Sequence, residues 1–184
     1  DFNAGGKQAE QAMFRLITQF AQGEISDAIN YQPGNPNYRR VWDDIIAAAE
    51  EFNDPGHFTT FIAFEWTSLV SGNNLHRNVI FRDGAERAGR VEPYTTTPPI
   101  GSRNPRDLWK WMQAYEDTTG GSVLAIPHNG NLSNGMMCAL EDDFDNEAPY
   151  DAEYAKQRQK WERLYEATQY KGDGETHPLL SPED

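Results

Sequence analysis

Apolar residues in the first fifty positions recur at steps of three and four, which is the period of an amphipathic helix. One such stretch runs from Lys7 to Ala21. A second begins at Asn35-Pro36, a cap followed by proline at the first helical position, and runs to about Phe52. The breaker sequence Asn53-Asp54-Pro55-Gly56 then stops it. We therefore expect residues 1–55 to form a helical lead-in.

Runs of β-branched and aromatic residues follow. Residues 58–66 (FTTFIAFEW) and 78–81 (NVIF) are strand-like, and the turn sequence at 71–74 (SGNN) permits them to pair as a hairpin. Residues 122–127 (SVLAIP) form a continuous apolar run, which is typical of a strand buried on both faces. Residues 163–169 (RLYEATQ) are a fourth candidate strand.

Two more helices separate these strands. One starts at Asn104-Pro105 and ends before Gly120-Gly121, and a charged one runs from Asp151 to about Lys160. Because each connection is long enough to contain a helix, the order predicts an α/β fold with mostly parallel strands. In such folds ligands gather at the carboxyl ends of the strands.

Composition narrows the classes of partner. The 184 residues include 29 acidic and 16 basic side chains, for a net charge of -13, so the surface should repel nucleic acid and anionic lipid. No apolar run approaches the roughly 20 residues of a membrane span. We expect a soluble protein, either cytoplasmic or periplasmic, that binds neither nucleic acid nor membrane. The single Cys138 excludes a Cys-rich zinc cluster and leaves His, Asp and Glu as metal ligands.

Three of the predicted strands end in residues that bind metals or move protons, namely Glu65, His128 and Glu166. A carboxylate in an aromatic strand is costly to bury unless it is paired or bound to a cation. Glu65 therefore either meets a cation or lies on the solvent side of an edge strand. His76 begins the strand after the turn, so a hairpin would return it close to Glu65.

A carboxylate and two imidazoles, from Glu65, His76 and His128, suit Zn²⁺, Mn²⁺ or Fe²⁺. For any one histidine a structural role is the commoner explanation, and only the three together favour ligation. The two remaining histidines differ: His57 is expected to stop a helix, whereas His177, in a polar glycine-rich segment, either lines a site or belongs to a loop.

Five motifs extend these observations: residues 64–68 (FEWTS), 75–81 (LHRNVIF), 104–109 (NPRDLW), 126–131 (IPHNGN) and 171–178 (KGDGETHP). Together they resemble a bacterial family of unknown function that is related to the PHP (polymerase and histidinol phosphatase) metal-dependent hydrolases. The resemblance covers most of the chain from about Thr59 onward.

The resemblance implies a distorted (β/α)7 barrel with mostly parallel strands, in which His, Asp and Glu bind divalent zinc, manganese or iron. It implies hydrolysis of a small-molecule substrate, such as a phosphoester, by metal-activated water. Glu65, His76 and His128 resemble the metal ligands. The residues that would line the substrate pocket or support the ligands are Arg77, Asn129, Asn131, Glu166, Gln169, Lys171 and His177.

The family pattern also has an amino-terminal His-x-His, an Asp-His pair and a carboxy-terminal Asp-x-His, which this sequence lacks. Together with a start at Asp1 and an end at Ser181-Pro182-Glu183-Asp184, this predicts that residues 1–184 are one partial domain from the centre of the barrel. The rest of its own polypeptide would supply the other ligands. Alone, the fragment would be metal-free or inactive, and its open sheet edges would favour pairing with another copy.

The sequence thus predicts part of a metal-dependent hydrolase, a phosphoesterase by resemblance. Two alternatives remain. One is a non-catalytic module that binds a carbohydrate or another small ligand through Trp66, Trp109 and Trp111, and the other is a structural fragment. Convergence of Glu65, His76 and His128 would distinguish the hydrolase hypothesis from the binding module and from the structural fragment.

Overall fold

The computed structural model describes residues 2–22, 32–98, 100–139, 144, 150–174 and 179. The chain divides into two compact units, Asp1–Val41 and Trp42–Asp184. Of the residues singled out from the sequence, His177 lies outside the described part.

The first unit contains a short 3-10 turn, η1 (Phe2–Ala4), and helix α1 (Gly6–Gln22), which confirms the helix predicted for Lys7 to Ala21. Helix α2 (Pro36–Phe52) begins in this unit and continues into the second. At its start the Asn35 side chain accepts a hydrogen bond from the Asn37 N–H at 2.8 Å, as expected of a helix cap.

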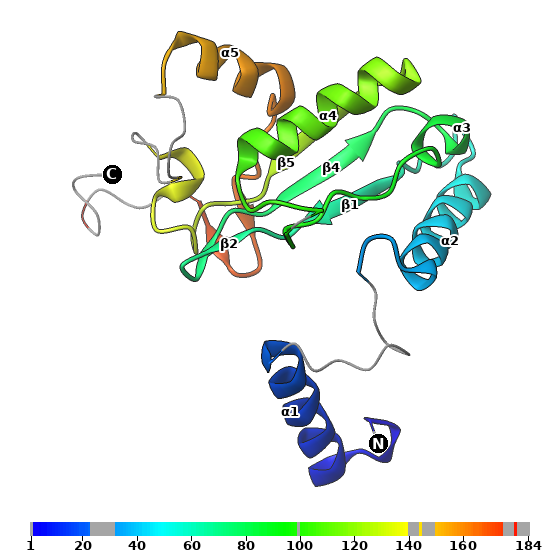
Figure 1. Cartoon of the computed structure of the whole chain (residues 1–184), viewed down its shortest axis with the longest axis vertical. Helices are drawn as coiled ribbons and strands as arrows, with labels where there is room; N and C mark the ends of the chain where they lie inside the picture. Colours follow the sequence, from blue (N-terminus) through cyan, green and yellow to red (C-terminus); the bar gives the residue numbers. More distant parts are fainter. Residues whose placement is uncertain are drawn as a thin grey trace. The chain divides into compact units, whose positions relative to one another are not determined.

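The second unit contains most of the regular structure (Figure 1). Its helices are α3 (Ala85–Ala88), α4 (Pro105–Thr119) and α5 (Ala152–Trp161), with a 3-10 turn at η3 (Met136–Cys138). Its strands are β1 (Ala63–Trp66), β2 (Leu69–Val70), β3 (Asn73–Asn74), β4 (Arg77–Phe81), β5 (Val123–Pro127), β6 (Thr168–Gln169) and β7 (Gly172–Asp173). The predicted helices at 104–119 and 151–160 are therefore confirmed, whereas the predicted strand at 163–169 shrinks to the two residues of β6.

The expectation of a mostly parallel (β/α)7 barrel is wrong. The main sheet has the order β1-β4-β5, and both pairs are antiparallel. The strand pairs β2-β3 and β6-β7 are also antiparallel, and the described residues form no closed barrel. The predicted hairpin between the first two strands is present, with Glu65 opposite Asn78 and Trp66 opposite Arg77.

The long connection between β4 and β5 explains the error. After β4 the chain first returns along the sheet through the irregular residues 89–98 and 100–104, so that the Arg103 carbonyl accepts from the Ser68 hydroxyl at 2.8 Å near the end of β1. Helix α4 then runs back, and at its far end the Tyr115 hydroxyl donates to Asp83 at 3.0 Å, just after β4. A helix in a crossover implies parallel strands only when the helix itself makes the return.

The two faces of the sheet differ. Residues that alternate along the strands, among them Trp66, Val79, Phe81 and Ala125, are buried with α2 and α4 in a core rich in aromatic rings. Figure 1 shows α4 lying along the sheet. The opposite face carries half-buried or exposed positions, because successive side chains of a strand point to opposite sides. This face presents Glu65.

None of the helices in the described ranges is both long enough and apolar enough to cross a membrane.

Candidate metal centre

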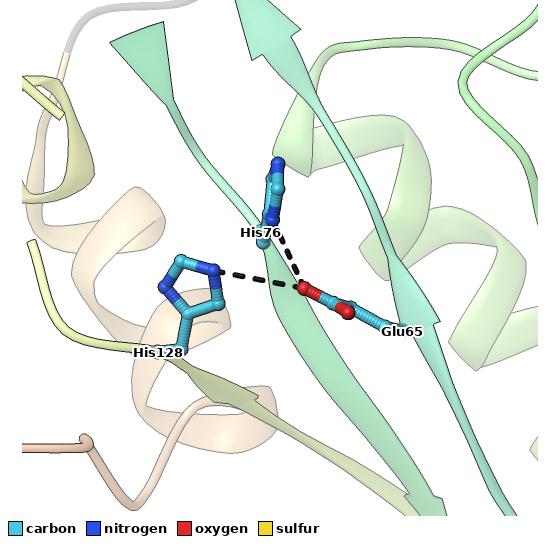
Figure 2. A group of neighbouring side chains, drawn as sticks. All are labelled: Glu65, His76 and His128. Carbon is cyan, nitrogen blue, oxygen red and sulfur yellow. Dashed lines mark hydrogen bonds and ion pairs between the residues drawn. The ribbon is translucent and has the colours of Figure 1, made fainter. Parts of the chain in front are cut away.

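Glu65, His76 and His128 converge at one end of the main sheet (Figure 2). Glu65 lies in β1, His76 immediately precedes β4, and His128 immediately follows β5. One oxygen of Glu65 lies 2.9 Å from Nδ1 of His76 and 3.6 Å from Nε2 of His128. One ligand atom from each residue lies within 4.8 Å of the others. The sequence prediction that a hairpin brings His76 to Glu65 is confirmed.

Glu65 lies on an edge strand, and its side chain is 46% exposed. Its neighbours in sequence point into the core, because Trp66 is fully buried and Phe64 packs against Trp42. The solvent-side interpretation of Glu65 is thus compatible with its contact to both histidines. Because the Glu65 carboxylate is half-exposed, its position beside the histidines does not require an unpaired charge to be removed from water.

His76 is held by the turn that precedes it. Its backbone N–H donates to the Asn74 side chain at 3.2 Å. Burial lowers the pKa of the His76 imidazole, and electrostatic interaction with His128 and Lys171 lowers it further. The Glu65 carboxylate raises this pKa and so opposes part of the shift. The ring is therefore neutral near pH 7 and has a lone pair. Its Nε2 atom is buried and has no hydrogen-bond partner among the described residues.

His128 is buried, with 7% of its side chain exposed. Its backbone N–H donates to the His76 carbonyl at 3.3 Å, which extends the strand pairing to the two ligand residues. Its Nδ1 lies 3.2 Å from the Asn129 carbonyl oxygen. Because a carbonyl only accepts, Nδ1 carries the proton and the lone pair is on Nε2, the atom that faces Glu65. Metal-binding histidines are commonly fixed in this way.

The donor set fits a divalent cation. Two atoms bound tetrahedrally at about 2.0–2.1 Å from one Zn²⁺ are roughly 3.4 Å apart. The separations from Glu65 to His76 and to His128, 2.9 and 3.6 Å, lie on either side of that value. Two imidazoles and one carboxylate also match the preferences of zinc, manganese and iron.

A second layer of polar residues fixes the loop that carries His128. A carboxylate oxygen of Glu166 accepts from the Asn129 N–H at 2.9 Å and from the Gln169 side chain at 2.6 Å. The hydrogen bond from Asn129 is the main reason that the pKa of Glu166 lies below its usual value. Gln169, His128 and Lys171 lower this pKa further, and the four effects together outweigh burial, which raises it. The sequence placed Glu166 and Gln169 near the site, and the structure brings them there.

The β6-β7 hairpin packs against the same loop. The side-chain amides of Asn129 and Asn131 donate to the carbonyls of Gly172 and Lys171, each at 2.6 Å. The oxygens of both amides are buried and find no partner in the part of the chain that the structure describes. The hydrogen bond to its carbonyl holds the backbone of Lys171 against the loop that follows His128.

Arg77 does not join the cluster. It lies opposite Trp66 in the β1-β4 pair, on the core face of the sheet, and its side chain is 2% exposed. Its Nε donates to Glu162 at 3.1 Å, and its guanidinium lies 5.8 Å from the Trp66 ring centre. Arg77 thus forms a buried ion pair rather than part of a substrate pocket.

Sequence reasoning missed three residues that support this end of the sheet. Glu162 pairs with Arg77, Asn74 holds the His76 backbone, and the Tyr165 hydroxyl accepts from the Gly130 N–H at 2.7 Å. Asn74 was recognisable, because asparagine commonly accepts from the backbone two residues on. Glu162 and Tyr165 carry no local signal, since their partners are 85 and 35 residues away.

The described residues therefore define a domain of helices packed on an antiparallel sheet, with a cluster suited to a divalent cation. Residues 2–184 match the family described as "Protein of unknown function (DUF3604)", so the chain belongs to this family. No match was found among curated proteins or among solved structures.

Proposed function

We propose that Glu65, His76 and His128 bind one divalent cation and form part of a metal-dependent hydrolase centre that acts on a phosphoester. The convergence of the three ligand atoms within 4.8 Å carries this proposal. The resemblance of the surrounding motifs to PHP-related hydrolases supplies the reaction class.

Each residue has a distinct role in the proposal. His128 presents the Nε2 lone pair because its Nδ1 proton is engaged by the Asn129 carbonyl. Glu65 supplies the negative charge that a cation requires, and its exposed side chain leaves the centre open to solvent. When bound, a divalent cation lowers the pKa of a water ligand and polarises a phosphoryl oxygen.

Lys171 is suited to the substrate rather than to the cation. Its backbone is held against the His128 loop by the hydrogen bond from Asn131, and its positive charge would attract an anionic group at the cluster. Glu166 and the two asparagines hold the His128 loop in place through the hydrogen bonds described above. We expect their removal to weaken cation binding without removing a ligand.

The structure does not favour a carbohydrate platform. Trp66 is fully buried and Trp109 is 4% exposed, while Trp111 stacks with Tyr94 and Tyr115 against the core. An aromatic platform needs an exposed ring face, which these residues do not offer.

The proposal is tested by hydrolysis of 4-nitrophenyl phosphate and bis(4-nitrophenyl) phosphate with added Zn²⁺, Mn²⁺ or Fe²⁺. The full polypeptide and residues 1–184 are assayed in parallel. We expect H128A and E65Q to lose metal-dependent turnover in whichever chain is active.

The matched control is H57A, because the exposed His57 ring pairs with Asp54 at 3.0 Å and with no other side chain among the described residues. Turnover that survives H128A, or that falls equally in H57A, would sink the hydrolase assignment. So would the absence of metal-dependent turnover on both substrates by the full polypeptide.

A further inference from the structure

A second feature, a cavity of about 260 Å³, lies at the other end of the main sheet. Its walls include the end of β4, the start of β5 and the residues around the end of α5. Leu124, which lines it, precedes His128 by four residues, or about 13 Å along an extended strand. The cavity therefore does not belong to the metal centre.

The cavity wall combines an apolar surface with positive charge. The apolar part includes Ile80, Val123 and Leu124, and the cationic part includes Arg82 and Arg163. No ion pair or side-chain hydrogen bond joins either arginine to another described residue. The other two charged residues of the wall neutralise each other, since the Lys160 ammonium lies 3.4 Å from the Glu116 carboxylate.

Both arginines are exposed, so their guanidinium groups lie on the solvent side of the cavity. They add positive charge at this place in a chain whose net charge is -13. Cations beside an apolar surface leave an attractive field for an anion, and guanidinium groups match the planar geometry of a carboxylate.

Trp161 also forms part of the cavity wall, and its side chain is otherwise buried, with 1% exposed. Its indole signal therefore reports on a ligand that occupies the cavity.

We propose that this cavity binds a small organic carboxylate with an apolar body. The ring or chain would lie against Ile80, Val123 and Leu124, and the carboxylate would be recognised by Arg82 and Arg163. The volume equals that of roughly eight or nine water molecules, which suits a ligand with one ring or a short chain. This inference is independent of cation binding at Glu65, His76 and His128.

The test is an NMR titration of the ¹⁵N-labelled protein with 4-phenylbutanoate. The chain has five tryptophans, and the W161F variant identifies the indole signal of Trp161 by its loss. We expect this signal to shift as the ligand is added, because Trp161 lines the cavity. R82Q and R163Q should each weaken binding roughly fivefold or more.

Three controls separate charge, apolar contact and the metal centre. The neutral 4-phenylbutanamide and the small anion acetate should each bind at least several-fold more weakly than 4-phenylbutanoate. R40Q, which removes an exposed arginine outside the cavity, and H128A should bind the carboxylate as the wild type does.

An unmoved Trp161 signal at millimolar 4-phenylbutanoate overturns the proposal. So does equal binding of the amide, or unchanged affinity in R82Q and R163Q. Loss of binding in H128A, with the protein still folded, would assign the ligand to the metal centre and likewise overturn it.

Discussion

His76 and Arg77 are consecutive residues that belong to opposite kinds of charged cluster. His76 faces Glu65 and His128 on the half-exposed side of the sheet. Arg77 faces the core, where it binds Glu162, whose side chain is 1% exposed. A difference of one position along the chain decides which role a charged residue takes, because strand side chains alternate between faces.

The two clusters also differ in how far their carboxylates are exposed to solvent. Glu162 accepts from Arg77 at 3.1 Å and from the Trp109 indole at 2.9 Å, and it lies 3.3 Å from Arg158. At the metal centre, by contrast, the Glu65 side chain is 46% exposed. A carboxylate that is enclosed by protein donors stabilises a fold, whereas one that is open to solvent is available to a ligand. Three substitutions compare buried carboxylates with this exposed one.

The largest effect is expected for E162A. Removing one partner of a buried ion pair leaves the other charge uncompensated, which typically costs about 3–5 kcal/mol. We expect a decrease of this size in the free energy of unfolding, measured by urea denaturation. The double variant R77M/E162L should recover a large part of it, because the deeply buried Arg77 is then not left unpaired, and the remaining partner, Arg158, is 23% exposed. A cost below about 1 kcal/mol for E162A would mean that the pair is not buried in solution.

A smaller effect is expected for D83N. The Asp83 carboxylate accepts from the Ser122 N–H at 2.6 Å and the Arg87 side chain at 2.7 Å, besides the Tyr115 hydroxyl. Burial alone would raise the pKa of Asp83, but these three donors outweigh it and hold the pKa below its ordinary value of 3.8. We expect D83N to cost roughly 1–3 kcal/mol at pH 7.

The pH dependence of this cost has a defined sign. Since the pKa of Asp83 is lower in the folded state, the unfolded chain takes up the proton first as the pH falls. The stabilisation is therefore fully present above about pH 5 and declines below about pH 4. Denaturation curves of wild type and D83N should converge in that range. A difference that stays constant down to pH 3 would contradict the role given to these hydrogen bonds.

The smallest effect on stability is expected for E65Q. Without added metal, removing a half-exposed carboxylate should change the free energy of unfolding by no more than about 0.5 kcal/mol. With Zn²⁺ at a hundred times its dissociation constant, the wild type should gain about 2.7 kcal/mol and E65Q markedly less. An equal gain in both proteins would show that zinc binds elsewhere.

Much of the local structure was predictable from the sequence. The capped helices and the hairpin follow from periodicity and from turn residues such as Ser71-Gly72, both of which have positive φ angles. The hairpin in turn places His76 beside Glu65. These predictions succeed because they depend on residues that are near one another in the chain.

The topology and the buried pair were not predictable in the same way. The antiparallel order depends on the path of residues 89–104, which have no regular period. The partner of Arg77 is Glu162, 85 residues away, on an element whose packing no local pattern indicates. Arg77 could therefore be grouped with His76 by sequence proximity, although the two residues lie on opposite faces.

Calorimetric titration of the metal-free protein with Zn²⁺ tests the central claim most directly. We predict one equivalent per chain with wild type and H57A, and loss of that equivalent with H76A, H128A and E65Q. Saturation of H76A and H128A at one equivalent, with the affinity of the wild type, would contradict the assignment of Glu65, His76 and His128 as a metal centre.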